Sequence, residues 1–320
     1  MTAASIVVIT QDMDITADLV ITELHRRGAN LVRFDLADFP ETLTQIAYLV
    51  PGRTRWTGAL RGPLRDVDLS AVRSVWYRKP APFTLHPDLT ATERQWAAAE
   101  AEMGFGGLLA GLQARWVNRP DRIALAGRKP LQLSTAAACG LRVPESLLTN
   151  DPDQARLFCR THKEVIYKPL TGGPGSENGH RVALRADIVT ADQITDGIRR
   201  TTHLFQERIP CAYAVRLTVV GSRMFAVRID TPAGVEVVDW RAVHDQLSYT
   251  PIDVPADVVA GINALMDTLG LVYAAPDFVV DHEGRWHFHG DLNPGGQWAW
   301  IAPLRQDITR ALADELTEGL

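Results

Sequence analysis

The chain has 320 residues, of which 46% are apolar and 22% are charged, a composition typical of a soluble globular protein with room for two or three subdomains. Its formal net charge of −5 argues against general nucleic-acid binding, which favours a basic domain. No apolar run approaches membrane-spanning length, the N-terminus does not read as a signal peptide, and the three cysteines lack CxxC spacing, so we expect a reduced, cytoplasmic protein.

The chain begins with a β-α-β pattern. Ser5–Thr10 is predicted to be a buried strand, Ala17–Arg27 an amphipathic helix ended by a glycine, and Leu31–Phe34 a second strand. This order predicts a parallel α/β layer. No glycine-rich fingerprint follows the first strand, which argues against a dinucleotide site there. A hairpin is predicted next, from Gln45–Val50 and Trp56–Leu60.

The third predicted strand of this layer, Val72–Pro80, ends in two cations, Arg78 and Lys79. On chemistry alone, a basic strand end is as good an interpretation as a binding site for an acidic ligand, which would need such cations beside a groove. A long helix, Thr90–Leu112, is predicted to close the first domain.

The middle of the chain combines a lysine-bearing strand with a glycine-rich loop. Arg115–Pro120 is predicted to be a connector in which Asn118 serves as a helix cap or turn residue. The apolar strand Glu164–Leu170 contains Lys168, and burying an ammonium group without an anionic partner is costly. Thr171–Gly179 has four glycines and could lay backbone N–H groups against phosphate oxygens, although it lacks the P-loop pattern.

Three antiparallel strands are predicted to follow, at Ala214–Val220, Met224–Asp230 and Val235–Arg241. They carry several charged residues, among them Arg216, Arg228, Asp239 and Arg241. Any one of these arginines could be an ordinary surface residue. Together they are better interpreted as clamps for phosphate and carboxylate groups, because the planar guanidinium group binds both through paired hydrogen bonds. Helices are predicted at Asp257–Leu269 and Gln306–Glu318, the second most simply for core packing.

An acidic hairpin is predicted between these two helices, from the strands Phe278–Val280 and Trp286–Leu292. Asp291 and Asn293 are two positions apart and should share a face, and the bend could bring Asp277 beside them. Two carboxylates and an amide oxygen suit Mg²⁺, which keeps waters and bridges to substrate phosphates. The alternative is a surface hairpin with turn-forming Asp and Asn.

The spacing D-x(13)-D-x-N resembles the metal-binding end of ATP-grasp carboxylate–amine ligases. The N-P-G-G-Q-W sequence that follows is similar to that of the ATP-grasp ribosomal peptide maturases, the graspetide macrocyclases. So are V-W-Y-R-K-P at 75–80, K-P-L-Q-L at 129–133, R-L-T-V-V-G at 216–221 and D-W-R at 239–241. Asp291 is a departure, because that family more often has Glu there, and Asp shortens the reach by one methylene group.

The resemblance implies an α/β (α+β) protein with an ATP-grasp fold and an N-terminal α/β pre-ATP-grasp domain. It divides the chain into residues 1–117 on the peptide side, 118–203 as the central subdomain with a glycine-rich flap, and 204–320 as the C-terminal subdomain with the metal site. It also implies a homodimer that uses ATP and Mg²⁺ and binds neither nucleic acid nor membranes.

The resemblance also implies roles for individual residues. Lys129, on a helix, and Lys168 would contact the ATP phosphates, and Glu207 the ribose. The remaining nucleotide contacts would be Gly172, Gly173, Gln206, Arg208 and Ile209. The metal ligands would be Asp277, Asp291 and Asn293. Arg216, Arg228, Arg241 and Asp239 would act in catalysis, and Arg78 and Lys79 would bind the substrate.

The activity implied is that of an ADP-forming ligase. It would activate Asp or Glu side chains of a ribosomal precursor peptide, with a leader and an acidic core, as acyl phosphates. Ser or Thr hydroxyls or Lys amines of the same peptide would then attack, giving macrocyclic esters or amides. Two alternatives stay open: a ligase that adds a free amino acid to a carboxylate, as glutamate ligases do, and a non-catalytic ATP- or peptide-binding protein. No general base can be chosen among His180, His244 and His289.

Overall fold

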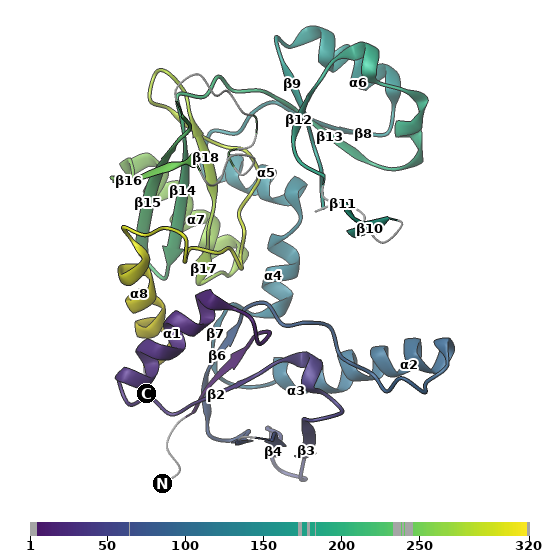
Figure 1. Cartoon of the computed structure of the whole chain (residues 1–320), viewed down its shortest axis with the longest axis vertical. Helices are drawn as coiled ribbons and strands as arrows, with labels where there is room; N and C mark the ends of the chain where they lie inside the picture. The colour runs from purple at the N-terminus through teal and green to yellow at the C-terminus, as the bar shows by residue number, and fades with distance from the viewer. Residues whose placement is uncertain are drawn as a thin grey trace.

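The computed structural model describes residues 5–63, 65–171, 175–177, 180–182, 184–232, 238, 240 and 246–318. The N-terminal part forms one end of the long axis of the molecule, and the central and C-terminal sheets lie together toward the other end (Figure 1). Within the described residues, no helix is both long enough and apolar enough to cross a membrane. The predicted strand over 235–241 and the predicted flap residues Gly172 and Gly173 lie outside the described residues.

The N-terminal part is built on a four-stranded sheet whose neighbouring strands are all parallel. In the order β2-β1-β6-β7, its strands are Leu31–Phe34, Ser5–Ile9, Val72–Tyr77 and Arg115–Val117. Helix α1 (Ile15–Arg26) connects β1 to β2 and is capped by Asp14. The predicted parallel α/β layer is therefore confirmed. The carboxyl ends of its strands meet at one edge, where open α/β sheets commonly bind ligands.

Two smaller features complete this part of the molecule. The predicted hairpin is present and gains a third strand, giving an antiparallel sheet of β3 (Thr44–Tyr48), β4 (Thr57–Arg61) and β5 (Asp66–Asp68). The single helix predicted over 90–112 is interrupted by a π-helical turn, so that it consists of α2 (Ala91–Ala101), η2 (Glu102–Gly106) and α3 (Gly107–Ala110).

The central region contains a four-stranded antiparallel sheet in the order β12-β9-β13-β8. Its strands are Asp187–Val189, Val165–Lys168, His203–Glu207 and Ser146–Thr149. The other elements are α4 (Pro120–Ala126), α5 (Lys129–Ala138), α6 (Pro152–Thr161), the short hairpin β10 (Gly175–Glu177) and β11 (His180–Val182), and the 3-10 turns η3 (Ala191–Gln193) and η4 (Asp196–Arg200). Because β13 belongs to this sheet, we propose moving the domain boundary from residue 203 to Glu207.

The C-terminal region contains a six-stranded antiparallel sheet. Along the order β16-β15-β14-β18-β19 its strands are Ser248–Ile252, Arg223–Asp230, Tyr213–Val220, Asp277–Val280 and Trp286–Phe288, and β17 (Tyr273–Ala274) also pairs with β14. Helix α7 (Ala256–Leu269) packs its apolar side on one face of this sheet and ends at Gly270, which has the left-handed φ of 65° that favours glycine.

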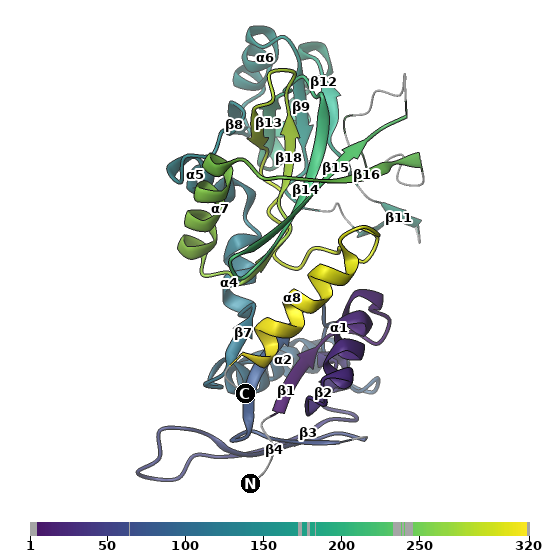
Figure 2. The same cartoon turned by 90° about the vertical axis from the view of Figure 1, so that its left-hand side faces the viewer.

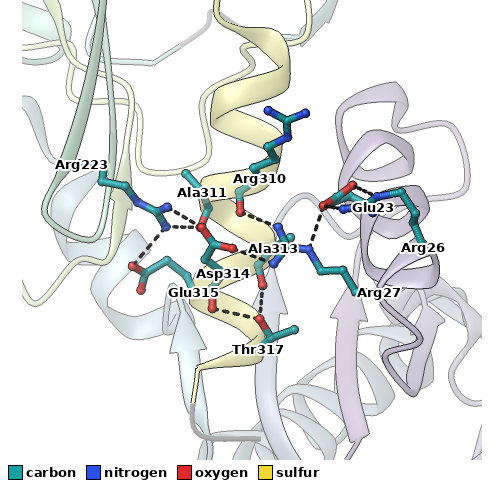
Figure 3. A network of polar contacts seen from close by, with 10 residues as sticks. All are labelled: Glu23, Arg26, Arg27, Arg223, Arg310, Ala311, Ala313, Asp314, Glu315 and Thr317. Carbon is teal, nitrogen blue, oxygen red and sulfur yellow. Dashed lines mark hydrogen bonds and ion pairs between the residues drawn. The ribbon is translucent and has the colours of Figure 1, made fainter.

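Helix α8 (Arg305–Thr317) returns from the C-terminal sheet to the N-terminal part and lies beside α1 (Figure 2). Its buried side chains share one apolar cluster with residues of β1, α1 and β15. Ion pairs add to this contact, because Asp314 binds Arg27 at 2.7 Å and Arg223 at 2.5 Å (Figure 3). The last helix was predicted to pack in the core, and here that core is common to two regions of the molecule.

Candidate active site

A cavity of about 890 Å³ lies between the central sheet and the C-terminal sheet. On the central side it is lined by Lys168 at the end of β9 and by residues that end and follow β13. On the other side it is lined by Tyr213, Asp230 and the segment after β19. Lys129, the first residue of α5, also reaches the cavity. Two lysines from separate elements therefore meet the acidic segment after β19 at this cavity.

Asp291 is at the centre of this cluster of charges. Its Oδ2 lies 2.8 Å from Nζ of Lys168, and its Oδ1 accepts a short hydrogen bond from Nζ of Lys129. Burial opposes the ionisation of Asp291, but Lys168, His289 and Lys129 hold its pKa well below the usual range. The sequence suggested an anionic ligand as the partner of the buried Lys168, whereas in this structure the partner is the carboxylate of Asp291.

His289 belongs to the same cluster. Its Nδ1 lies 2.5 Å from Nζ of Lys168 and 3.2 Å from Oδ2 of Asp291, and Lys168 also donates to its backbone carbonyl at 2.6 Å. Burial, together with the neighbouring charge of Lys168, lowers the pKa of His289, in agreement with this geometry. His289, in the segment that follows β19, thus holds the ammonium group of Lys168 in place.

Asp277, the first residue of β18, is the second predicted metal ligand and is 1% exposed. It pairs across the strands with Arg216 of β14, whose Nε lies 2.8 Å from its Oδ1. The side-chain amide nitrogen of Asn293 lies 3.2 Å from Oδ2 of Asp277. The backbone N–H of Asp277 donates to the carbonyl oxygen of Asp291 at 3.0 Å. The three predicted ligands therefore lie together.

The way in which these ligands meet differs from the prediction. Strand β19 ends at Phe288, so Asp291 and Asn293 are not placed by strand alternation. Instead the chain bends at Gly290, with φ 83°, and at Asn293, with φ 50°. A Cβ atom at Gly290 would lie 3.1 Å from the side chain of Leu133, and Asn tolerates the left-handed region better than most residues. Two residues with left-handed backbone conformations, Gly290 and Asn293, thus lie where the end of a strand was predicted.

These residues fit a magnesium ion. The described part of the chain has no group of three or more His, Cys, Asp or Glu side chains that could hold a metal ion, and the candidate set here has two carboxylates and an amide. Two carboxylates and one amide supply only hard oxygen ligands, which suits an ion that completes its shell with water and phosphate oxygens. Within this cluster three cations, Lys129, Lys168 and Arg216, face the two carboxylates, which leaves positive charge for an anionic ligand.

Arg216 lies against two indole rings that also contact each other, with ring centroids 5.4 Å apart. Its guanidinium carbon lies 5.6 Å from the ring centroid of Trp240 and 5.7 Å from that of Trp300. It also donates to the carbonyl of Ala275 at 3.3 Å. Stacked and hydrogen-bonded in this way, Arg216 has a fixed orientation beside Asp277.

Arg228 is the second predicted clamp and lies on β15. Its Nη2 is 2.6 Å from Asp230 Oδ1, and its guanidinium carbon lies 4.2 Å from the ring centroid of Tyr213. Tyr213 and Asp230 both line the cavity. Arg228 is therefore already paired with a carboxylate in this structure. The other two catalytic candidates, Asp239 and Arg241, lie outside the described residues.

The chain matches one family and several solved structures. Residues 5–124 match the MvdD pre-ATP-grasp domain family. A ribosomal-peptide-associated ATP-grasp ligase of Chryseobacterium gregarium, solved with ADP and a leader and core peptide, is 26% identical with a TM-score of 0.90, over 99% of this chain and 97% of that one. The macrocyclase MdnB of Microcystis aeruginosa MRC is 26% identical with a TM-score of 0.80, over 99% and 100%. No curated protein matches.

The chain has an ATP-grasp fold with a pre-ATP-grasp domain. The resemblance to the ATP-grasp ribosomal peptide maturases that the motifs predicted is confirmed, and so is the mixed α/β fold class. The macrocyclase MdnC of the same Microcystis strain, bound to its precursor peptide MdnA, is 24% identical with a TM-score of 0.85, over 98% of this chain and 100% of that one, and supports the fold.

The predicted nucleotide residues of this ATP-grasp chain divide into two groups. Glu207 and Ile209 line the cavity at the end of β13 and just after it, where a ribose and base could bind. Gln206 also borders the cavity, but its side chain is 2% exposed and donates to Ser146 Oγ at 3.0 Å. Its amide is thus engaged by β8. Arg208 forms an ion pair with Glu164 at 3.0 Å.

The two predicted peptide-binding cations differ in their surroundings. Arg78 is buried, and its Nε lies 2.6 Å from Oδ2 of Asp14. This guanidinium group is thus paired with a carboxylate inside the N-terminal domain, and its substrate-binding role stays a prediction. Lys79 is half-buried, and burial together with the adjacent charge of Arg78 lowers its pKa. Of the pair, Lys79 is therefore the one that fits a substrate contact.

Sequence reasoning missed two buried amides that support the site. Gln132 of α5 accepts from the backbone N–H of Leu292 at 3.0 Å. Its place in K-P-L-Q-L was a signal, because residues three apart share one side of a helix. Asn118, predicted to be a cap or turn residue, is 2% exposed and binds the backbone of β17 and of Pro294. The sequence around Asn118, a polar connector, gave no sign that this side chain would bind Tyr273 and Pro294 much later in the chain.

Proposed function

We propose that this chain is an ADP-forming ligase that closes rings within a ribosomal precursor peptide. It would activate an Asp or Glu side chain of the peptide as an acyl phosphate and join it to a Ser or Thr hydroxyl or a Lys amine. The observation that carries this proposal is the convergence of Lys129 and Lys168 on Asp291, beside Asp277 and Asn293, at one cavity. This arrangement has cations for phosphates and hard oxygen ligands for a metal at the same point.

The chemistry explains why such a centre is needed. A carboxylate oxygen of the peptide attacks the γ-phosphorus of ATP, the bond from that phosphorus to the β–γ bridging oxygen breaks, and ADP leaves. The hydroxyl oxygen or amine nitrogen then attacks the acyl carbon, phosphate leaves, and one proton is released. Negative charge accumulates in the first step, so catalysis rests on positioning and on electrostatic stabilisation.

The residues of the chain have separate tasks in this scheme. Lys129 and Lys168 bind the phosphates, and Glu207 the ribose. Asp277, Asp291 and Asn293 would hold Mg²⁺, which supplies neutralisation of phosphate charge when bound. Arg216, packed against two indole rings, forms an ion pair with Asp277 and so orients its carboxylate. The reaction also requires that water be kept from the activated carboxyl group, which would otherwise be hydrolysed.

A peptide is the favoured substrate for two reasons. The Chryseobacterium gregarium ligase, 26% identical over almost the whole chain, was solved with a leader and core peptide. The chain has a net charge of −5, yet Lys79, Arg216 and Arg228 stand near the site, as an acidic core peptide requires. Asp239, Arg241, Gly172 and Gly173 keep their proposed roles in catalysis and phosphate binding, and the proposed homodimer can be tested by light scattering.

Mass spectrometry of a candidate precursor peptide, chosen from short reading frames beside the gene and co-expressed with the chain, tests the proposal. We expect the loss of one water per ring, and no loss with Asp291→Asn as the inactive control. A product that gained the mass of an amino acid would instead favour the glutamate-ligase type of reaction. An unchanged peptide together with ATP binding but no ATP turnover would favour a non-catalytic protein.

A further inference from the structure

The short loop that carries the metal ligand Asn293 is bound by side chains from outside it. Gly296 O accepts hydrogen bonds from the hydroxyl of Tyr273 at 2.7 Å and from Nη1 of Arg78 at 3.4 Å. Pro294 O accepts one from Nδ2 of Asn118 at 3.0 Å. Arg78 and Asn118 directly follow β6 and β7, so the carboxyl edge of the N-terminal parallel sheet contacts this loop.

Asn118 uses its whole amide for this contact. Its Nδ2 donates to Tyr273 O at 2.7 Å as well as to Pro294 O, and its Oδ1 accepts from the backbone N–H groups of Val272 and Tyr273 at 2.7 and 2.9 Å. A fully satisfied buried amide is rigid, because leaving any of these groups unpaired is costly. Asn118 thereby joins the strand β17 to the metal loop.

Arg78 is equally fixed. Its partner Asp14 also accepts from Thr10 Oγ1 at 2.8 Å and from the backbone N–H of Ala17 at 3.2 Å. Both side chains of the ion pair are almost fully buried, with exposed fractions of 1% and 2%. Removing either partner would leave a buried charge uncompensated. The ion pair therefore fixes the guanidinium group of Arg78 beside Asp14.

The loop itself has no room to move away from these contacts. A Cβ atom at Gly296 would lie 2.6 Å from Cβ of Ala275 and 3.2 Å from Cβ of Asn293. The backbone N–H of Ala275 also donates to Asn293 O at 3.0 Å, and the side chain of Asn293 returns a bond to Ala275 O at 3.1 Å. Ala275 therefore holds Asn293 directly, and the hydrogen bonds to Pro294 and Gly296 hold the residues that follow it.

We propose that Asn118, Tyr273 and Arg78 are positioning residues for the metal site, so that the pre-ATP-grasp domain completes the site from outside the ATP-grasp subdomains. This inference rests on one part of the proposed function, the binding of Mg²⁺ by Asp277, Asp291 and Asn293. None of the three residues touches the metal or the substrate in this scheme. They act by fixing the backbone on which the Asn293 ligand is carried, and two of them, Arg78 and Asn118, directly follow strands of the N-terminal parallel sheet.

The test measures metal binding directly. Tyr273→Phe removes one hydrogen bond to the loop and little else, and Asn118→Ser keeps a neutral polar group that is too short to reach Pro294. The probe is Mn²⁺, followed by electron paramagnetic resonance with a non-hydrolysable ATP analogue bound. We expect Mn²⁺ affinity to fall about 3- to 10-fold in Tyr273→Phe, as one lost hydrogen bond implies, and at least as far in Asn118→Ser, which loses more than one. Affinity for the analogue without metal should stay the same.

The matched controls are Tyr77→Phe and Asn30→Ser. Tyr77 packs in the separate apolar cluster of the N-terminal domain, and Asn30 binds Ser5 at the opposite, amino end of the sheet. A merely structural role would lower the melting temperature and leave the Mn²⁺ affinity of the folded protein unchanged. If Tyr273→Phe bound Mn²⁺ as the wild type does, the positioning role would be overturned, even if Asn118→Ser failed to fold. Failure of the proposed function would appear separately, as wild-type protein that leaves the peptide unchanged.

Discussion

Asp291 competes with the nucleotide for the two lysines of the site. In this structure Lys129 and Lys168 both contact its carboxylate, and the same two ammonium groups are the ones available for phosphates. Binding of ATP with a metal would exchange these ion pairs, because the metal takes the carboxylate while the phosphates take the lysines. The sequence identified all three residues, but it could not reveal that they neutralise one another.

The lysines can be tested by replacing each with alanine. We expect Lys129→Ala and Lys168→Ala to weaken binding of a non-hydrolysable ATP analogue about 10-fold or more, because each removes a charge-assisted hydrogen bond to phosphate. Calorimetric titration measures this, with Lys163→Ala as the control because Lys163 is an exposed lysine just before β9. Unchanged affinity in both variants would remove the assignment of these lysines to the phosphates.

The carboxylate can be tested by Asp291→Asn, which keeps the shape and removes the charge. We expect the metal-free affinity for the ATP analogue to stay or to rise, because the lysines are released. Magnesium-dependent turnover should be lost, because the ion loses a charged ligand. Asp291→Glu, the commoner residue in the family, should retain partial activity. Wild-type turnover by Asp291→Asn would contradict the metal role.

At the scale of elements, α8 ties the N-terminal part to the C-terminal sheet through Asp314. Burial opposes its ionisation, but hydrogen bonds from Arg223 and Arg27 lower its pKa. On α1, hydrogen bonds from Arg26 and Arg27 lower the pKa of Glu23 to about 2. The two pairs of Asp314 bridge segments far apart in the sequence (Figure 3), which is why periodicity predicted the helix and its buried side but not its ion-pair partners.

This network should make the protein sensitive to acid. Both carboxylates have folded-state pKa values below their unfolded values near 4, so their stabilisation is complete above that pH and is lost as pH falls toward 2. We expect Asp314→Asn, together with Glu23→Gln, to flatten the fall in melting temperature between pH 5 and pH 3. At neutral pH, Asp314→Asn should cost about 1 kcal/mol or less, because its side chain is 46% exposed. Equal acid sensitivity in wild type and double variant would contradict this role.

At the scale of the whole molecule, the sequence singled out three candidate metal ligands and two lysines because they sit in ordered motifs with specific spacing, and the structure brings these five residues together. It did not predict how they meet, because strand β19 ends at Phe288 and the bends at Gly290 and Asn293 depend on packing against other elements. It also did not reveal that Arg78 is paired with Asp14, because Asp14 lies 64 residues earlier in the chain. Local pattern thus predicted the elements and the type of chemistry, whereas charge pairing across the fold decided which cations remain available.

The apolar core shared by α1, β15 and α8 predicts that the pre-ATP-grasp domain does not unfold separately. Leu312 of α8 is fully buried in the same cluster as Val20 and Leu24 of α1 and Val227 of β15. We therefore expect Leu312→Ala to destabilise the whole chain by about 2–5 kcal/mol. Differential scanning calorimetry should show one transition, moved to lower temperature, and Leu157→Ala on α6, where the side chain is 52% exposed, should shift it little. Two separate transitions in Leu312→Ala would mean that the N-terminal part is stable without α8, and the metal loop would then lack the rigid outer support that Arg78 and Asn118 require.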